Sequence, residues 1–128
     1  MSKKKTTVRP FDVKAYAYYL RKAKGRRSVH QFASDCKITP FYVKHSLSGE
    51  ITAPPLPQTL RRISDASEGF VPYYRLLYIA GYDLDQCYTM TERDKELYEF
   101  FGSVLKTIAV MAASEETPAS EDFYELAE

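Results

Sequence analysis

The sequence predicts an all-α protein that consists of one small domain and a C-terminal extension. Apolar residues recur at intervals of three and four residues along most of the chain, which is the spacing of a buried helix face. Capping residues, prolines and glycines separate these stretches at the places where helices begin and end. No stretch carries a convincing strand pattern. The 128 residues, 45% of them hydrophobic, suffice for a single core.

The first two helices are expected before residue 37. The first starts after Asp12, a good N-cap, and ends at Gly25. Ser28 is the N-cap of a second helix over residues 29–35. The residues expected on the buried faces are Val13, Tyr16, Ala17 and Leu20 in the first helix and Val29, Phe32, Ala33 and Cys36 in the second.

The third and fourth helices lie on either side of a proline-rich loop. Thr39 caps the third helix, Pro40 takes its first position, where the missing N–H costs nothing, and Gly49 ends it. The loop over residues 50–57 holds three prolines that a helix interior would not tolerate. In the fourth helix the expected inward residues are Leu60, Ile63 and Ala66.

Two more helices complete the prediction. The fifth begins near Pro72, ends at Gly81 and turns Tyr73, Leu76, Leu77 and Ala80 inward. The sixth starts at a T-x-x-D capping signature, Thr91 to Asp94, and runs to about residue 113. Its apolar stripe must be covered by the rest of the domain or by a second copy, and we expect a homodimer. The candidate dimer-interface residues are Leu97, Phe101, Val104, Leu105, Ile108 and Ala112.

The net charge of +1 conceals two halves of opposite sign. Residues 1–62 hold fourteen Lys and Arg against three acids, a net charge of +11, and residues 63–128 hold four against fourteen, a net charge of −10. Such an asymmetry indicates that the first half faces a polyanion and that the second half has another role. The alternative is that two solvated faces merely differ in sign.

The chain ends are expected to lie outside the folded domain. Residues 1–10 are read as a basic, mobile arm of the kind that touches phosphates, and residues 114–128, with six acids and no base, as a disordered tail. The arm lacks the apolar core of a secretory signal, and no long apolar span is present. We therefore expect a cytoplasmic protein without a membrane partner.

The second and third predicted helices form a helix-turn-helix, two short helices joined by a tight turn. The segment resembles the lambda-repressor-like (Cro or XRE-type) helix-turn-helix family. The resemblance is carried by VHQFASDCKITPFYV at 29–43, by Gly49, by the P-x-x-x-T-L-x-x-I pattern at 55–63 and by LLYIAGY at 76–82. It implies a five-helix DNA-binding domain over residues 11–82, followed by the helix at 91–113. Where the family has a turn glycine this chain has Lys37, which must then adopt a left-handed conformation.

The resemblance implies a sequence-specific, DNA-binding transcriptional regulator of phage or mobile-element type, with residues 40–48 as the recognition helix in the major groove. Two such helices in a dimer would meet half-sites about one DNA turn apart. The implied base-contact candidates are Pro40, Phe41, Lys44, His45 and Ser48. The phosphate-contact candidates are Lys3, Lys4, Lys5, Lys22, Lys24, Arg26, Arg27, Ser28 and Lys37.

Other function classes find less support in the sequence. The rival to a DNA-binding function is a degenerate helix-turn-helix that docks on a protein, such as an antirepressor or a phage-encoded inhibitor, through Pro40, Phe41, Tyr42 and Leu47. His30 and His45 have no ligands at metal-site spacing, and Cys36 and Cys87 are too far apart for one. No nucleophile elbow, phosphate loop or catalytic carboxylate pair is present. We expect no enzyme activity, no cofactor and no metal.

Overall fold

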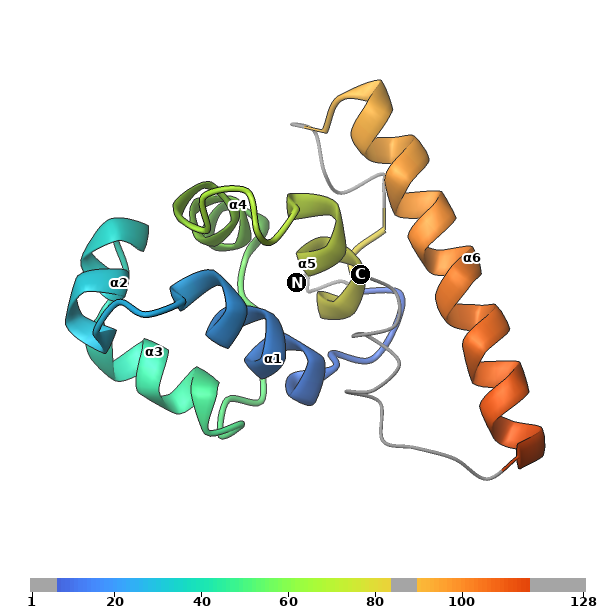
Figure 1. Cartoon of the computed structure of the whole chain (residues 1–128), viewed down its shortest axis with the longest axis horizontal. Helices are drawn as coiled ribbons and strands as arrows, with labels where there is room; N and C mark the ends of the chain where they lie inside the picture. The colour runs from blue at the N-terminus through green and yellow to red at the C-terminus, as the bar shows by residue number, and fades with distance from the viewer. Residues whose placement is uncertain (1–6, 84–89, 116–128) are drawn as a thin grey trace, which may run out of the picture.

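The computed structural model describes residues 7–83 and 90–115, and within these ranges the chain forms six α-helices and no β-strand (Figure 1). The helices are α1 (Val13–Lys24), α2 (Val29–Cys36), α3 (Pro40–Leu47), α4 (Pro57–Ala66), α5 (Tyr73–Ala80) and α6 (Glu92–Glu115). The expected all-α fold is confirmed. Side chains are described as far as residue 112, so most of the acidic tail lies outside the described part.

The helix starts follow two kinds of local signal. In α1 the carboxylate of Asp12 accepts a hydrogen bond from the N–H of Ala15 at 3.0 Å. At α6 the Thr91 hydroxyl accepts from the N–H of Asp94 at 3.1 Å, and the Asp94 carboxylate accepts from the N–H of Thr91, which is a complete capping box. Helices α4 and α5 have no side-chain cap and begin at prolines instead. Short-range chemistry therefore determines where each of these helices begins.

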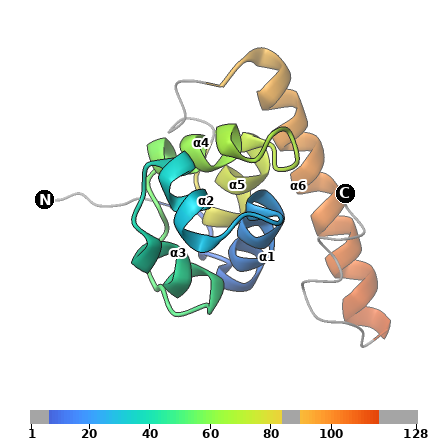
Figure 2. The same cartoon turned by 60° about the vertical axis from the view of Figure 1, so that its left-hand side comes forward.

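Helix α1 is the centre of the core, in contact with α3, α4 and α5 (Figure 2). Its buried side chains include two large aromatic residues, Tyr16 and Tyr19, both fully buried. The other large side chains that are fully buried are Leu20, Phe32, Cys36, Val43, Leu60, Ile63, Val71, Leu76, Leu77 and Ile79. Every helix from α1 to α5 thus contributes side chains to one hydrophobic core. Helices α2 and α3 lie on the outside of the domain (Figure 2).

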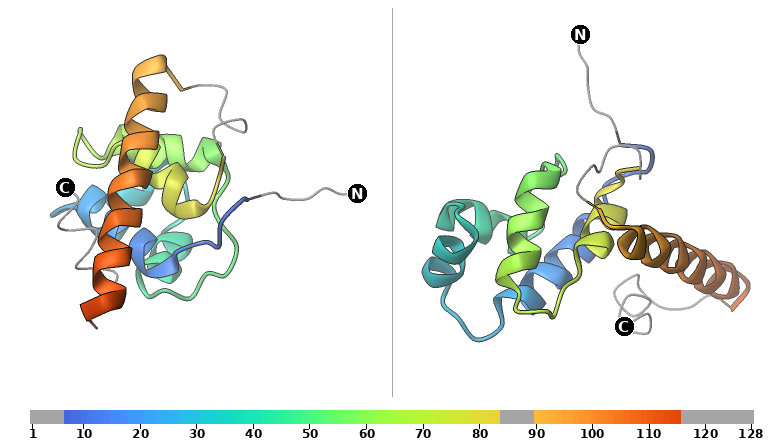
Figure 3. Two further views of the ribbon diagram at one scale, coloured as in Figure 1. Left: turned by 90° about the vertical axis from the view of Figure 1, so that its right-hand side faces the viewer. Right: turned by 90° about the horizontal axis from the view of Figure 1, so that it is seen from above.

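Helix α6 packs on α5 through an aromatic seam (Figure 3). The ring of Phe101 lies edge-on to Tyr74 and to Tyr78, at centroid distances of 5.9 and 5.5 Å. Gly102 permits the close approach, because a Cβ at this position would lie 2.7 Å from the Tyr78 ring. With 24 residues against the 8 of α5, helix α6 extends well past its partner. None of the helices in the described residues is both long and apolar enough to cross a membrane.

Residues 7–10, predicted to belong to a mobile arm, are instead attached to the end of α5. The N–H of Val8 donates to the carbonyl of Gly81 at 2.7 Å. The Arg9 guanidinium lies 3.8 Å above the Tyr78 ring and donates to the Tyr98 hydroxyl at 2.6 Å, so it joins α5 to α6. Gly81 has a φ of 97°, and a Cβ there would collide with the Arg9 carbonyl. The ordered chain therefore begins before residue 11.

Candidate nucleic-acid interface

The candidate interface is built on α2, α3 and the turn between them, residues 37–39. The Ser28 and Thr39 hydroxyls accept hydrogen bonds from the N–H groups of Gln31 and Tyr42, at 3.0 and 3.1 Å, and so cap the two helices. Lys37 adopts φ 62° and ψ 42°, the left-handed conformation expected of a residue that replaces a turn glycine. The chain can then reverse direction immediately after α2.

The inner face of α3 is fixed to α1. Val43 and Ser46 are fully buried, and the hydroxyl groups of Tyr42 and Tyr16 lie 3.4 Å apart. Burial raises the pKa of Tyr16 well above its ordinary value, and the neighbouring Tyr42 adds to the rise. The Ser46 hydroxyl lies beside these two tyrosines without a partner in good hydrogen-bond geometry among the described residues. Helix α3 is thus held by one face, and its opposite face is left to solvent.

The outward face of α3 carries the predicted base-contact residues at helical spacing. Phe41 is 69% exposed, Lys44 and Ser48 are exposed, and Pro40 and His45 are half-buried. The Phe41 and His45 rings are in contact, with their centroids 4.1 Å apart and their planes tilted by 50°, and His45 Nδ1 lies 2.7 Å from a carboxylate oxygen of Glu50. The Ser48 hydroxyl donates to the carbonyl of His45. This face therefore combines an aromatic surface with one cation.

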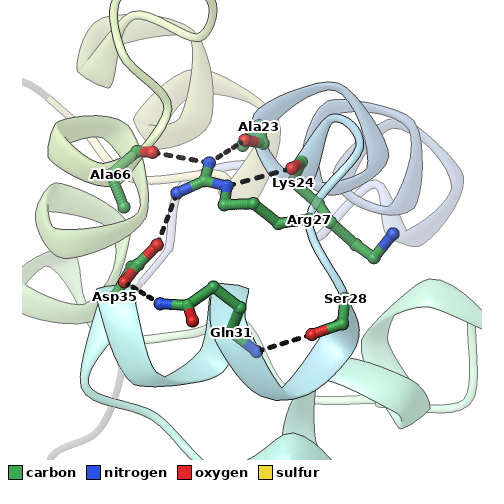
Figure 4. A network of polar contacts seen from close by, with 7 residues as sticks. All are labelled: Ala23, Lys24, Arg27, Ser28, Gln31, Asp35 and Ala66. Carbon is green, nitrogen blue, oxygen red and sulfur yellow. Dashed lines mark hydrogen bonds and ion pairs between the residues drawn. The ribbon is translucent and has the colours of Figure 1, made fainter.

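Arg27, predicted to contact phosphate, is instead committed to the interior of the fold (Figure 4). Its guanidinium donates to the carbonyls of Ala23, Lys24 and Ala66 at 2.6, 3.1 and 2.7 Å, and to the Asp35 carboxylate at 2.8 Å. The hydrogen bond from Arg27, with a second from the Gln31 amide, lowers the pKa of Asp35. The sequence did not indicate this network, because adjacent basic residues in a sequence give no sign of which one turns inward.

The remaining cations lie at the end of α1, in the turns on either side of α2, and on α3. Arg26, Lys37 and Lys44 are exposed and form no ion pair within the described part of the chain. Lys24 is half-buried at the end of α1, and Lys22, in the same helix, lies 5.8 Å from the Tyr18 ring. Lys3, Lys4 and Lys5 fall outside the described residues. Arg26, Lys37 and Lys44 therefore remain as exposed charge around α2 and α3, whereas Arg27 and Arg61 are paired with Asp35 and Asp65.

A basic hollow adjoins these turns, and sequence reasoning did not predict it. Its volume is about 720 Å³, and it is lined by the end of α1 with Lys22 and Lys24, by the turn that follows with Arg26, and by the turn between α4 and α5. On the latter turn Phe70 is 64% exposed. Its lining comes from segments about 40 residues apart, which local sequence patterns do not bring together.

The candidate dimer-interface residues of α6 divide into two groups. Phe101 is buried in the seam with α5, and Leu97 and Leu105 pack against the same core, so these three are used within the chain. Val104, Ile108 and Ala112 are half-buried, whereas Phe100, Val110 and Met111 are largely exposed. Phe101 was expected at the dimer interface but is buried against Tyr74 and Tyr78 of α5, because the apolar stripe of α6 includes the residues that α5 covers.

The described residues contain no group of three or more side chains suited to hold a metal ion. Cys36 is buried, and burial raises the pKa of its thiol to about 11, which keeps it protonated at neutral pH. Cys87 lies outside the described residues. Comparison of the chain with protein-family models, with curated proteins and with solved structures finds no match in any of the three.

Proposed function

We propose that this protein is a small DNA-binding transcriptional regulator, of phage or mobile-element type, built on a lambda-repressor-like helix-turn-helix domain. The observation that carries the proposal is the orientation of α3. One face is anchored in the core through Val43 and Ser46, and the opposite face presents Phe41 and Lys44 to solvent. A helix held in this way at the surface of a basic domain has the dimensions and charge to enter a major groove.

The exposed cations supply the affinity in this proposal. Arg26, Lys37 and Lys44 surround the start of α2, the turn and the outer face of α3. Cations that are not already neutralised by acids can replace the counterions of DNA phosphates, which makes binding depend steeply on salt. Arg27 has no part in this set, because its donors are satisfied inside the fold.

The test measures binding to a short duplex of random sequence by fluorescence anisotropy, from about 50 to 200 mM salt. Lys44→Ala and Arg26→Ala should each weaken binding and reduce the slope of log K against log salt by about one. Lys106→Ala is the matched control, since Lys106 is exposed on α6, on the far side of the domain from α3 (Figure 1). Absence of binding at low salt, or equal slopes for all the variants, would contradict the proposal.

The alternative is a helix-turn-helix scaffold that docks on another protein. Of the apolar residues considered for such a surface, Tyr42 is half-buried and meets Tyr16, and Leu47 packs against the core. Phe41 is the exposed member of that set. A single aromatic side chain between a lysine and a histidine is a small docking surface, and this favours the DNA-binding proposal over the alternative.

We also infer a homodimer through α6. Phe100, Val104, Ile108 and Met111 follow one another along the helix beside the seam with α5, and two of them are largely exposed. The stripe is self-complementary. In an antiparallel pair Phe100 of one copy meets Met111 of the other, and Val104 meets Ile108, so that aromatic and thioether groups make favourable contacts.

A further inference from the structure

The first turn of α3 presents an apolar surface where a recognition helix ordinarily carries hydrogen-bonding side chains. Phe41 is 69% exposed, and Pro40 before it has no side-chain donor or acceptor. Exposing a phenyl ring to water is unfavourable, and nothing in the described part of the chain covers it. The ring lies at the end of the helix that would enter the groove first in the proposed complex.

The Phe41 ring is held in place rather than free to turn away. It packs against the His45 ring, one helical turn further along, with the two centroids 4.1 Å apart and the ring planes tilted by 50°. His45 is itself fixed, because its Nδ1 makes a 2.7 Å contact with the Glu50 carboxylate and its carbonyl accepts hydrogen bonds from the Ser48 hydroxyl and the Glu50 N–H. A surface ordered before binding loses less conformational entropy when it meets a ligand. An apolar ring held in this way is suited to distinguish one apolar group from another by contact.

We propose that Phe41 recognises the C5-methyl group of thymine in the major groove, with His45 and Glu50 as the residues that position it. This inference rests on the proposed DNA-binding function. Of the four base pairs only those with thymine display a methyl group in the major groove, and an apolar side chain reads it by contact. No Asn, Gln or Arg stands on the outward face of α3, formed by residues 41, 44, 45 and 48, so Lys44 is the one side chain there of a type that commonly makes bidentate hydrogen bonds to a base.

The experiment exchanges single thymines for deoxyuridine, which removes the methyl group and leaves base pairing unchanged. Duplexes that the full chain retains from a random pool are sequenced, and each thymine of the retained sequence is replaced in turn. We expect one position in each bound site at which deoxyuridine weakens binding about four-fold, the effect of one buried methyl group. In Phe41→Ala the two duplexes should bind equally, while the salt slope stays that of the unmodified protein.

Two further variants make the test specific. Phe70→Ala removes an aromatic side chain of similar exposure outside α3, and the preference for thymine should survive in it. Glu50→Ala releases His45 and should reduce the preference for thymine, although the loss of an acid beside the groove should raise the affinity for DNA as a whole. An unchanged preference in Glu50→Ala would overturn the positioning role.

Failure of the inference is distinguishable from failure of the proposed function. If the protein binds duplex DNA with the expected salt dependence but never distinguishes thymine from deoxyuridine, or retains no preferred sequence, the methyl contact is overturned and the DNA-binding function stands. A preference that persists in Phe41→Ala overturns it too. If no duplex binds at low salt, both fail together. Because Phe41 is exposed, its replacement should leave the thermal unfolding curve unchanged, which checks that the variant is folded.

Discussion

Arg26 and Arg27 stand side by side in the turn between α1 and α2, yet they serve different purposes. Arg26 is exposed and forms no ion pair in the described ranges. Arg27 joins α1, α2 and α4 by four hydrogen bonds and lies 5.0 Å from the Phe32 ring (Figure 4). Hydrogen bonds from a charged donor to partly buried acceptors contribute more than neutral ones, since their loss leaves the acceptors unsatisfied.

The two arginines should therefore separate stability from binding. Arg27→Ala should lower the free energy of unfolding by about 2 to 3 kcal/mol, because three backbone carbonyls and a carboxylate lose their donor. Arg26→Ala should change it by no more than about 0.5 kcal/mol and should weaken DNA binding instead. Urea unfolding of the two variants measures the first effect. Equal stability in both would mean that the Arg27 network adds nothing to the fold.

At the scale of helices, the sequence predicted much of the fold because helix limits are encoded locally. Asp12, Ser28 and Thr39 cap the helices that they were expected to cap, and Lys37 takes the left-handed conformation. The contact of Arg9 with α5 and α6 was not predicted. Its hydrogen-bond partners lie about 70 to 90 residues away in the sequence, and no local pattern indicates such distant partners. Of the residues expected on the outward face of α3, Phe41, Lys44 and Ser48 are exposed, whereas Pro40 and His45 are half-buried.

The seam between α5 and α6 offers a test in which two effects oppose each other. Replacing glycine by alanine inside a helix ordinarily stabilises it by about 1 kcal/mol. At Gly102, however, the new Cβ would lie 2.7 Å from the Tyr78 ring and would push the two helices apart. Overpacking of this kind costs about 1 to 3 kcal/mol, so we expect Gly102→Ala to be destabilising overall.

The midpoint of thermal unfolding, followed by circular dichroism, measures whether overpacking outweighs the gain in helix propensity. Ser103→Ala is the matched control, because Ser103 is exposed on the same helix and its replacement changes propensity without a clash. A higher midpoint in Gly102→Ala than in the unmodified protein would show that the seam has room for a methyl group. The expected order is Ser103→Ala at or above the unmodified protein, with Gly102→Ala below both.

At the scale of the whole molecule, the two ends of the domain present different surfaces. Helices α2 and α3 lie at one end, and α6 lies at the other (Figures 1 and 3). A dimer formed through α6 would therefore carry its two α3 helices at its outer ends, with both domains between them. We accordingly expect half-sites separated by more than the single DNA turn that the helix-turn-helix resemblance suggests.

The dimer itself is tested at the stripe formed by Phe100, Val104, Ile108 and Met111. Removing the whole of α6 would be a poor test, because Phe101 and Tyr98 are buried against α5 and their loss would expose the core. Replacement of both Phe100 and Met111 by Glu leaves that seam intact and places two like charges opposite each other at each end of the proposed interface, where an unpaired charge is costly. Each of these side chains is more than half exposed within one chain, at 68% and 57%, so the fold itself should tolerate the change.

Light scattering should then give a mass near 14.7 kDa for the double variant and twice that for the unmodified protein. Lys106→Glu, which alters charge on another face of α6, should remain a dimer. A monomeric unmodified protein would contradict the proposed homodimer. A double variant that still dimerises would mean that the two copies meet through another surface. If the dimer also binds DNA with both copies, its footprint should shorten to one half-site in the double variant, because two domains that no longer meet through α6 bind independently.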